Sequence, residues 1–243
     1  MPVGVFFINT FSIMIGGVLG TVAGKWLSKD FKEKMGMVFG ACAMAMGISS
    51  IVLMQNMPAV VFSVVIGTAI GCAVHFGGLV EKLGKGLQKL IGKILKTDQG
   101  GADAAAYQAE LLTVIVLFCA SGTGIYGSIV EGMSGDASIL ISKSILDLFT
   151  SLIFACSLGL VVAFIAAPAF AVFFILFLLG GFIFPFTTPA MINDFKAVGG
   201  VLLIATGFRM IKVKMFPTAD MIPAMILAMP VSWFWTSVIT PLL

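Results

Sequence analysis

A lysine and an aspartate interrupt an apolar stretch in the middle of the chain. Lys143 and Asp147 stand four residues apart in the run ISKSILDLFTSLIFACSL, a spacing that places both side chains on one face of a helix, where they can form an ion pair. Charged side chains at membrane depth are costly and usually face a protein interior or a water-filled path. Two interpretations stay open: a structural pair that docks on polar groups of the preceding span, or a centre that couples an ion or a proton.

A run of small and hydroxyl-bearing residues precedes this pair. Residues 121–136 read SGTGIYGSIVEGMSGD. Glycine has no side chain and tolerates positive φ, so such a cluster inside a hydrophobic span predicts an interrupted helix or a close backbone approach. A small ion or polar solute would meet hydroxyls and freed carbonyls at the break. The candidate binding residues here are Ser121, Thr123, Tyr126 and Ser128.

Two further groups of polar residues are candidates for the same kind of site. Glu131 and Asp136 flank the turn GMSGD, where two carboxylates either collect cations or form a solvated acidic loop. In PFTTPAM, Pro185 and Pro189 each remove a backbone donor and bend or end a helix. Thr187 and Thr188 then either satisfy freed carbonyls or touch a ligand, and ordinary helix termination is the alternative.

The composition excludes a water-soluble protein. Hydrophobic residues make up 60% of the chain and charged residues 10%, with a mean hydropathy of +1.14. These values predict an all-α, polytopic transmembrane bundle that forms a single integral membrane domain over residues 1–243. The four cysteines fall in apolar spans, and no metal cluster, phosphate loop or catalytic motif is present in the sequence. We therefore expect no enzyme activity, metal, cofactor or nucleic-acid partner.

Eight segments are long and apolar enough to cross a bilayer, which takes about 20 residues. They are 4–24, 35–54, 58–79, 109–128, 138–166, 169–187, 197–213 and 219–240. The fifth segment is longer than a simple crossing requires, which leaves a tilted span or a re-entrant piece within 129–142 open. With both termini outside, twelve of the fourteen basic residues lie on the cytoplasmic side.

The chain resembles itself at an offset of 164 residues. Gly16 then falls on Gly180 and Asp30 on Asp194. Because the two copies would cross the membrane in opposite directions, the pattern predicts an inverted repeat, which is characteristic of secondary transporters. The expected parts are repeat A at 4–79, a central broken pair at 109–166 and repeat B at 169–240.

Segment 79–96, between the third and fourth spans, carries leucines on one helical face and lysines on or beside the other. This pattern is typical of a helix in the headgroup plane that binds anionic lipid, and a plain positive topology signal fits it equally well.

Glycines at four-residue spacing line one face of the first and third spans. They are Gly16, Gly20 and Gly24, followed by Gly67 and Gly71. Such faces let helix backbones approach closely, either inside the monomer or between the subunits of a homo-oligomer.

Three long runs resemble a known family. They are VLFCASGTGIYGSIVEGMSGDASILISKSILDLFTSLIFACSLG, TTPAMINDFKAVGGVLLIATGFRM and KMFPTADMIPAMILAMP. These runs are similar to the YqgA-like bacterial inner-membrane family called domain of unknown function 554, over nearly the whole chain. The resemblance implies a bacterial cytoplasmic membrane and supplies no activity or binding residues.

The residues themselves favour a secondary transporter or ion-coupled permease for a small solute or ion. Lys143 and Asp147 would form its charged centre, with the 121–128 backbone as part of the pocket. An oligomeric channel and a non-transporting membrane scaffold or regulator are the alternatives.

Overall fold

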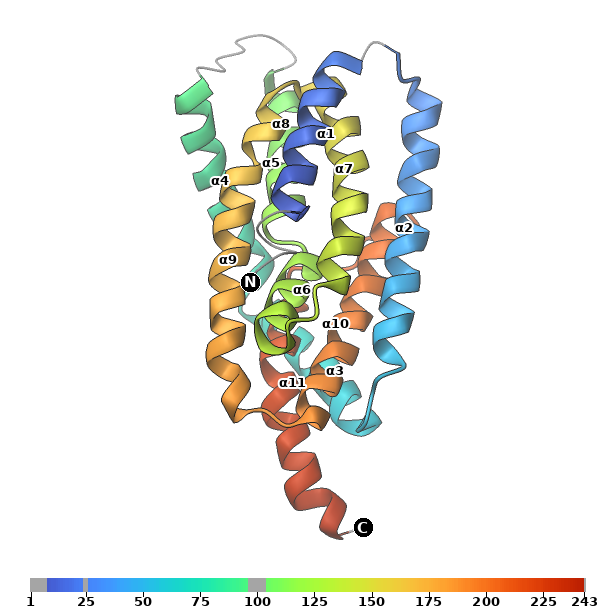
Figure 1. The fold of residues 1–243 in the computed structure, drawn as a ribbon, viewed down its shortest axis with the longest axis vertical. Coiled ribbons are helices and arrows are strands. Elements are labelled where there is room, and N and C mark those ends of the chain that lie inside the picture. Colours follow the sequence, from blue (N-terminus) through green and yellow to red (C-terminus); the bar gives the residue numbers. More distant parts are fainter. Residues whose placement is uncertain (1–7, 24–25, 96–103, 243) are drawn as a thin grey trace. The chain divides into compact units, whose positions relative to one another are not determined.

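A computed structural model describes residues 8–23, 26–95 and 104–242, and in these residues the regular structure is helical (Figure 1). The α-helices are α1 Thr10–Ala23, α2 Lys29–Ile51, α3 Met57–Ala73, α4 Phe76–Leu95, α5 Ala104–Cys119, α6 Gly122–Ser134, α7 Ser138–Leu158, α8 Val161–Phe164, α9 Ala166–Ile183, α10 Pro189–Met210 and α11 Ile222–Phe234. Short helical turns follow at η2 Phe184–Phe186, η3 Trp235–Ile239 and η4 Thr240–Leu242. The expected all-α fold is confirmed.

Among the described residues, six helices are long and apolar enough to cross a membrane, or up to seven if the bent pair Met57–Ala73 and Phe76–Ile91 is one span. The six are Asp30–Ile51, Glu110–Ser134, Ser138–Leu158, Val161–Phe186, Pro189–Met210 and Ile222–Leu242. Each overlaps at least one of the expected segments, and Val161–Phe186 overlaps both 138–166 and 169–187. The first expected segment, 4–24, begins in residues that are not described, and its described part is the shorter apolar helix α1. The count of eight stays a prediction.

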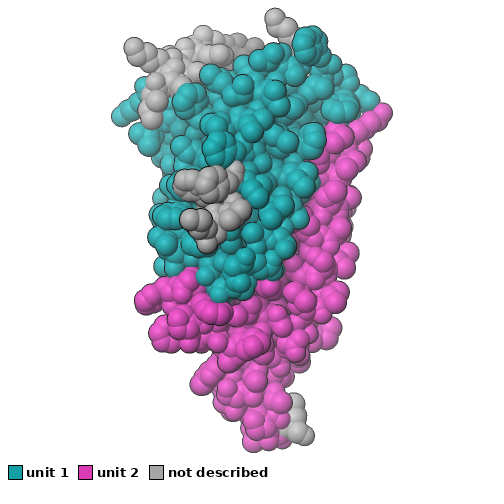
Figure 2. All heavy atoms as spheres, in the orientation of Figure 1, with its two compact units in different colours: residues 1–33, 78–179 teal, residues 34–77, 180–243 magenta. Residues whose placement is uncertain are grey.

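The chain divides into two compact units (Figure 2). Unit 1 comprises residues 1–33 and 78–179, and unit 2 comprises residues 34–77 and 180–243. Each unit therefore combines two segments that are separated in the sequence, and the division does not follow the expected repeat boundaries. The inverted repeat itself stays a prediction.

In unit 1, small residues bring α1 against α7 and α8. A Cβ built at Gly16 would collide with the Leu148 carbonyl, and one at Gly20 would collide with the Leu152 carbonyl. These two pairs advance together along the chain, so α1 and α7 run side by side in the same direction (Figure 1). Gly17 meets Ala163 of α8, where an added Cβ would lie 2.5 Å from the backbone nitrogen. Close backbone approach is what small residues permit in membranes.

Also in unit 1, α4 packs antiparallel to α5. A Cβ at Gly84 would lie 2.9 Å from Val116, and the Gln88 side chain donates a 2.8 Å hydrogen bond to the Gln108 carbonyl. Val80 and Ile91 are buried on this face, whereas Leu79, Leu83 and Leu90 are at least half exposed beside it. The buried stripe of α4 is therefore rotated from the leucine face expected for 79–96, and anionic lipid at this helix stays a prediction.

The expected continuous span 138–166 is wrong in its second half. Helix α7 ends at Leu158, and Gly159 follows with a φ of 75°. Glycine takes this left-handed conformation without a Cβ clash, so the chain turns there and continues as the short helix α8. The turn explains why the apolar run is longer than one crossing requires. Gly135, with φ of 73° and ψ of 4°, also has a positive φ but a different ψ from Gly159, and it separates α6 from α7 within the segment 129–142.

In unit 2, glycines join α2 to α10 and α3 to α11. A Cβ at Gly47 would lie 2.6 Å from the Gly200 carbonyl oxygen, and one at Gly207 would lie 2.7 Å from the Gly40 carbonyl oxygen. The numbers rise along one helix as they fall along the other, so α2 and α10 are antiparallel.

The glycines expected on the third span face α11. A Cβ at Gly67 would lie 2.6 Å from the Ala224 nitrogen, and one at Gly71 would collide with the Asp220 carbonyl. The described members of both predicted glycine faces thus pack against other segments of the same chain, Gly71 against the turn that precedes α11. Gly24 lies outside the described residues.

Candidate functional site

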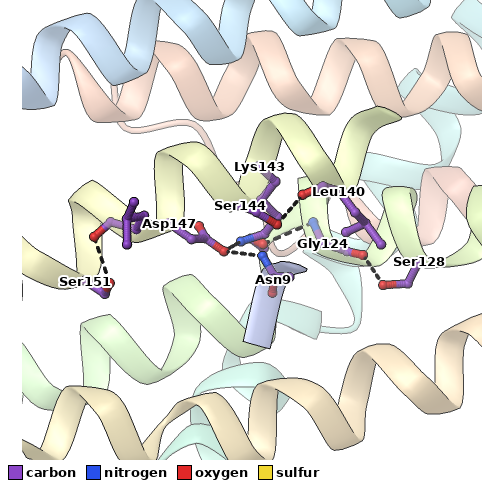
Figure 3. Close-up of polar contacts among 10 residues, drawn as sticks. Asn9, Gly124, Ser128, Leu140, Lys143, Ser144, Asp147 and Ser151 are labelled. Atoms are coloured by element: carbon purple, nitrogen blue, oxygen red, sulfur yellow. Dashed lines mark hydrogen bonds and ion pairs between the residues drawn. The ribbon is translucent and has the colours of Figure 1, made fainter. Parts of the chain in front are cut away.

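The centre of the candidate site is an ion pair inside α7. Lys143 Nζ and Asp147 Oδ2 are bonded one helical turn apart (Figure 3). Lys143 is 3% exposed and Asp147 is 6% exposed, so both charges are removed from the surface of unit 1. Helical spacing explains why the two side chains meet. Their enclosure depends on the helices that surround α7.

Asn9 is a third member of the site. Its Nδ2 donates a 2.8 Å hydrogen bond to the same Asp147 Oδ2, and the residue is 1% exposed (Figure 3). Asn9 immediately precedes α1, which Gly16 and Gly20 hold against α7. The sequence shows Asn9 as one polar residue near the start of the first span, and no local pattern connects it to a carboxylate 138 residues away.

Two aromatic rings cover the lysine. The Lys143 ammonium nitrogen lies 5.9 Å from the ring centroid of Phe118 in α5 and 5.7 Å from that of Phe173 in α9. Both rings are fully buried. Distances of this order are within the range of cation–π attraction. The ammonium is therefore held by a carboxylate and by two ring faces, and sequence reasoning missed both aromatic partners.

The helix before the site is interrupted, as the glycine-rich run predicts. Helix α5 ends at Cys119, and α6 begins at Gly122 after a break at Ala120 and Ser121. The Ser121 hydroxyl accepts a 3.2 Å hydrogen bond from the Gly124 backbone nitrogen and so caps α6. A serine in this position satisfies one of the donors that the start of a helix leaves free.

The other hydroxyl candidates lie inside α6. Thr123, Tyr126 and Ser128 are 8%, 1% and 0% exposed. The Ser128 hydroxyl donates a 2.7 Å hydrogen bond to the Gly124 carbonyl within the helix (Figure 3). A Cβ at Gly127 would lie 2.9 Å from the Leu140 side chain, so α6 packs directly on the first turn of α7. The structure thus brings α6 next to the helix of the ion pair.

Glu131 is not a residue of a solvated loop. It lies within α6, is 3% exposed, and its carbonyl accepts the 2.9 Å hydrogen bond from Gly135 that closes the helix. Asp136 does lie in the turn, where its carboxylate accepts a 3.1 Å hydrogen bond from the Ser138 backbone nitrogen. The sequence pattern placed the end of the helix too early because glycines 122, 124 and 127 are accommodated inside α6 or at its start.

Thr187 and Thr188 belong to unit 2 and have local helix-capping bonds. Thr187 follows η2 directly and donates a 2.7 Å hydrogen bond to the carbonyl of Phe184, the first residue of η2. The Thr188 hydroxyl accepts a 3.3 Å hydrogen bond from the Met191 nitrogen at the start of α10. These bonds match the helix-termination alternative.

Asp194 of α10 is a buried carboxylate that sequence reasoning did not select. It is 1% exposed, and its Oδ1 accepts hydrogen bonds of 2.8 and 2.9 Å from the backbone nitrogens of Gln55 and Asn56. Its Oδ2 accepts from Asn56 Nδ2 at 2.9 Å and from Ser232 Oγ at 2.6 Å. Asp194 precedes the expected span 197–213 and therefore looked like a loop residue. The available signal was its match to Asp30 in the internal repeat.

The comparison with known families agrees with the resemblance seen in the three sequence runs. Residues 4–233 match the model of a protein family described as "Protein of unknown function (DUF554)". The chain belongs to this family. The predicted resemblance is therefore confirmed over nearly the whole length of the protein.

Two proteins of known sequence are similar to this chain over most of its length. "Uncharacterized protein YqgA" of Escherichia coli K12 is 42% identical over 234 residues, covering 95% of this chain and 97% of the relative. "Uncharacterized membrane protein YdfK" of Bacillus subtilis 168 is 24% identical over 221 residues, covering 90% and 91%. No solved structure matches the chain. The protein is thus a multi-pass membrane protein of an uncharacterised family, with a bilayer as its surroundings.

Proposed function

We propose that this protein is a secondary transporter or ion-coupled permease for a small solute or ion in a bacterial cytoplasmic membrane, with both termini outside. The observation that carries the proposal is the enclosed Lys143–Asp147 pair, which contacts Asn9 and lies in the helix that packs on α6. Transport of this kind does not involve a catalysed chemical reaction.

Stability alone gives a weak reason for such a pair. Replacing a buried ion pair by well-packed apolar residues is often neutral or stabilising, whereas removing one partner is costly. Ionisable groups within membrane spans are therefore a functional hypothesis by default. Transporter sites also combine such groups with helices that are broken at membrane depth. The break at Ser121 and the pair in α7 belong to the same unit and meet this description.

The pair supplies a simple coupling device. Asp147 carries one negative charge, which Lys143 neutralises in this structure. A proton or a cation that binds Asp147 in place of Lys143 releases the lysine ammonium. The released ammonium then favours a different arrangement of the surrounding helices. Coupling of this kind needs two arrangements that differ in their affinity for the bound ion.

A flux assay tests the proposal. The intact protein is reconstituted in liposomes that contain a pH-sensitive dye, and sodium chloride and potassium chloride are added outside in turn. We expect a saturable change in internal pH with at least one salt, absent with Asp147→Asn. The control Asp194→Asn removes a buried carboxylate of unit 2 and should retain the flux per folded protein.

Other outcomes identify the alternatives. A current in planar bilayers that does not saturate would replace the transporter by a channel. Equal signals from the original protein, from Asp147→Asn and from empty liposomes in every salt would leave the scaffold or regulator, and the proposal would be wrong.

A further inference from the structure

The Lys143 ammonium occupies a cage made of groups that recognise organic ammonium ions. Asp147 contributes the negative charge on one side, and the rings of Phe118 and Phe173 contribute their faces at 5.9 and 5.7 Å. All four residues are 6% exposed or less. Aromatic faces beside a negative group are a common way of binding cationic ligands such as quaternary ammonium ions.

We propose that this cage binds a small primary alkylammonium ion, and that Lys143 fills it as a tethered substitute in the state described here. The inference rests on the proposed function and names the substrate class of the same site. A free ammonium ion enters when the lysine withdraws, and it takes over the bond to Asp147 and the contacts with both rings. The lysine and the substrate then alternate at one carboxylate.

The lining of the cage favours an organic cation over an inorganic one. Strongly hydrated metal ions need several oxygen ligands in their first shell. Here one carboxylate oxygen already accepts from Asn9 and Lys143, and ring carbons cover the lysine from two further helices. An anion would meet the charge of Asp147. An alkylammonium ion matches both the charge and the apolar surface, because the lysine side chain is itself an alkylammonium.

The two rings also connect the cage to the interrupted helix. Phe118 stands in the last turn of α5, directly before the break. The Phe173 ring lies so close to Gly124, in the first turn of α6, that an added Cβ would collide with it. A change in the angle between α5 and α6 would therefore move one ring relative to the other. Opening of the cage is thus coupled to the break, and Gly124 and Ser121 act as positioning residues.

Chemical rescue tests the site. Lys143→Ala removes the atoms of n-propylammonium from the lysine side chain, so this ion is the probe, and n-propanol is its neutral control. The full-length variant is titrated in detergent while thermal unfolding is followed by tryptophan fluorescence. We expect the unfolding temperature to rise with the logarithm of the probe concentration, by about 4 °C at about ten times the dissociation constant, and no rise with n-propanol. Lys143→Ala combined with Asp147→Asn should lose the response, and Phe173→Leu added to Lys143→Ala should weaken the affinity.

Lys143→Ser provides a second small side chain in case the alanine variant does not fold. The intact protein provides a third measurement, in which the probe must displace the lysine and the rise should be smaller. No rise in any folded member of these three proteins, or an equal rise with n-propanol, would overturn the cage.

The result is separable from the fate of the proposed function. If the probe stabilises Lys143→Ala but the original protein does not take up labelled ethylammonium, the cation site is supported and the transport role is wrong. If the protein shows saturable flux of another solute but the probe does not stabilise Lys143→Ala, the transport role is supported and the ammonium site is wrong.

Discussion

Asp147 in unit 1 and Asp194 in unit 2 are both carboxylates buried in membrane helices, 6% and 1% exposed, but they are compensated in different ways. Asp147 is neutralised by one flexible lysine from its own helix and accepts a further bond from Asn9. Asp194 accepts four hydrogen bonds from neutral groups, two of them backbone nitrogens at the start of α3. A helix N-terminus carries partial positive charge, which stabilises an anion there.

The contrast indicates which carboxylate can change its state. A rotation of the Lys143 side chain removes the one charged partner that Asp147 has in α7 and leaves Asp147 with the hydrogen bond from Asn9. The hydrogen-bond donors to Asp194 are backbone nitrogens between α2 and α3 and the side chains of Asn56 and Ser232. Freeing Asp194 would therefore require the connection between α2 and α3 to move away from α10. Under the proposed function, the first carboxylate is therefore the one that couples, and the second joins α3, α10 and α11 within unit 2.

The largest expected effect comes from breaking the ion pair on one side. Lys143→Met or Asp147→Asn should each lower the free energy of unfolding by about 3 kcal/mol, because an uncompensated charge or an unpaired polar group remains buried. Unfolding by denaturant in detergent micelles, followed by tryptophan fluorescence, measures the loss.

The double variant Lys143→Met with Asp147→Leu is the matched control. It removes both charges and should recover most of the lost stability while liposome flux stays absent. A double variant whose loss equals the sum of the single losses would show that the two residues do not act as a pair.

Asp194→Asn should have a smaller effect, a loss of about 1–2 kcal/mol of unfolding free energy. The amide oxygen still accepts from the backbone nitrogens of Gln55 and Asn56, but the amide nitrogen now faces the Asn56 side chain and Ser232. Flux per folded protein should not change. A loss of flux greater than the loss of folded protein would place Asp194 in the transport path and contradict the contrast between the two carboxylates.

The smallest expected effect comes from two helix caps, one in each unit. Ser121→Ala in unit 1 and Thr188→Ala in unit 2 each remove one side-chain cap and should each cost about 1 kcal/mol. We expect only Ser121→Ala to alter the apparent affinity in the flux assay, since its cap fixes Gly124 beneath the Phe173 ring. Equal affinities in both variants would separate the helix break from the site.

Several features could be predicted from the sequence because they are local. The i, i+4 spacing of Lys143 and Asp147 predicts their pairing on α7, and the glycine-rich run predicts the break before Gly122. Apolar length predicts eight spans, and the six helices of the described residues that are long and apolar enough to cross a membrane all overlap these segments. The sequence prediction is wrong where one local pattern is compatible with two structures. A long apolar run can be one tilted span or two helices, and the φ of 75° at Gly159 decides for the second.

The partners of the buried charges could not be predicted in the same way. Helix faces that meet lipid and faces that meet protein are both apolar in a membrane, so the hydrophobic pattern does not tell which side of a span is buried. Phe118 and Phe173 are two of the 22 phenylalanines in the chain, and nothing in their neighbourhood marks them. Asp194 precedes the expected span 197–213, and only the observed start of α10 at Pro189 places it inside a helix.

By itself, the sequence determined the class of the protein, its family, the position of the charged pair and the place where a helix breaks, because each depends on composition or on residues within a few turns of one another. The tertiary structure alone decided that Asn9 reaches Asp147, that two distant rings enclose Lys143, and that Asp194 receives the start of α3. These contacts join segments far apart in the chain, and only the close approach of helices through their small residues brings such side chains within bonding distance.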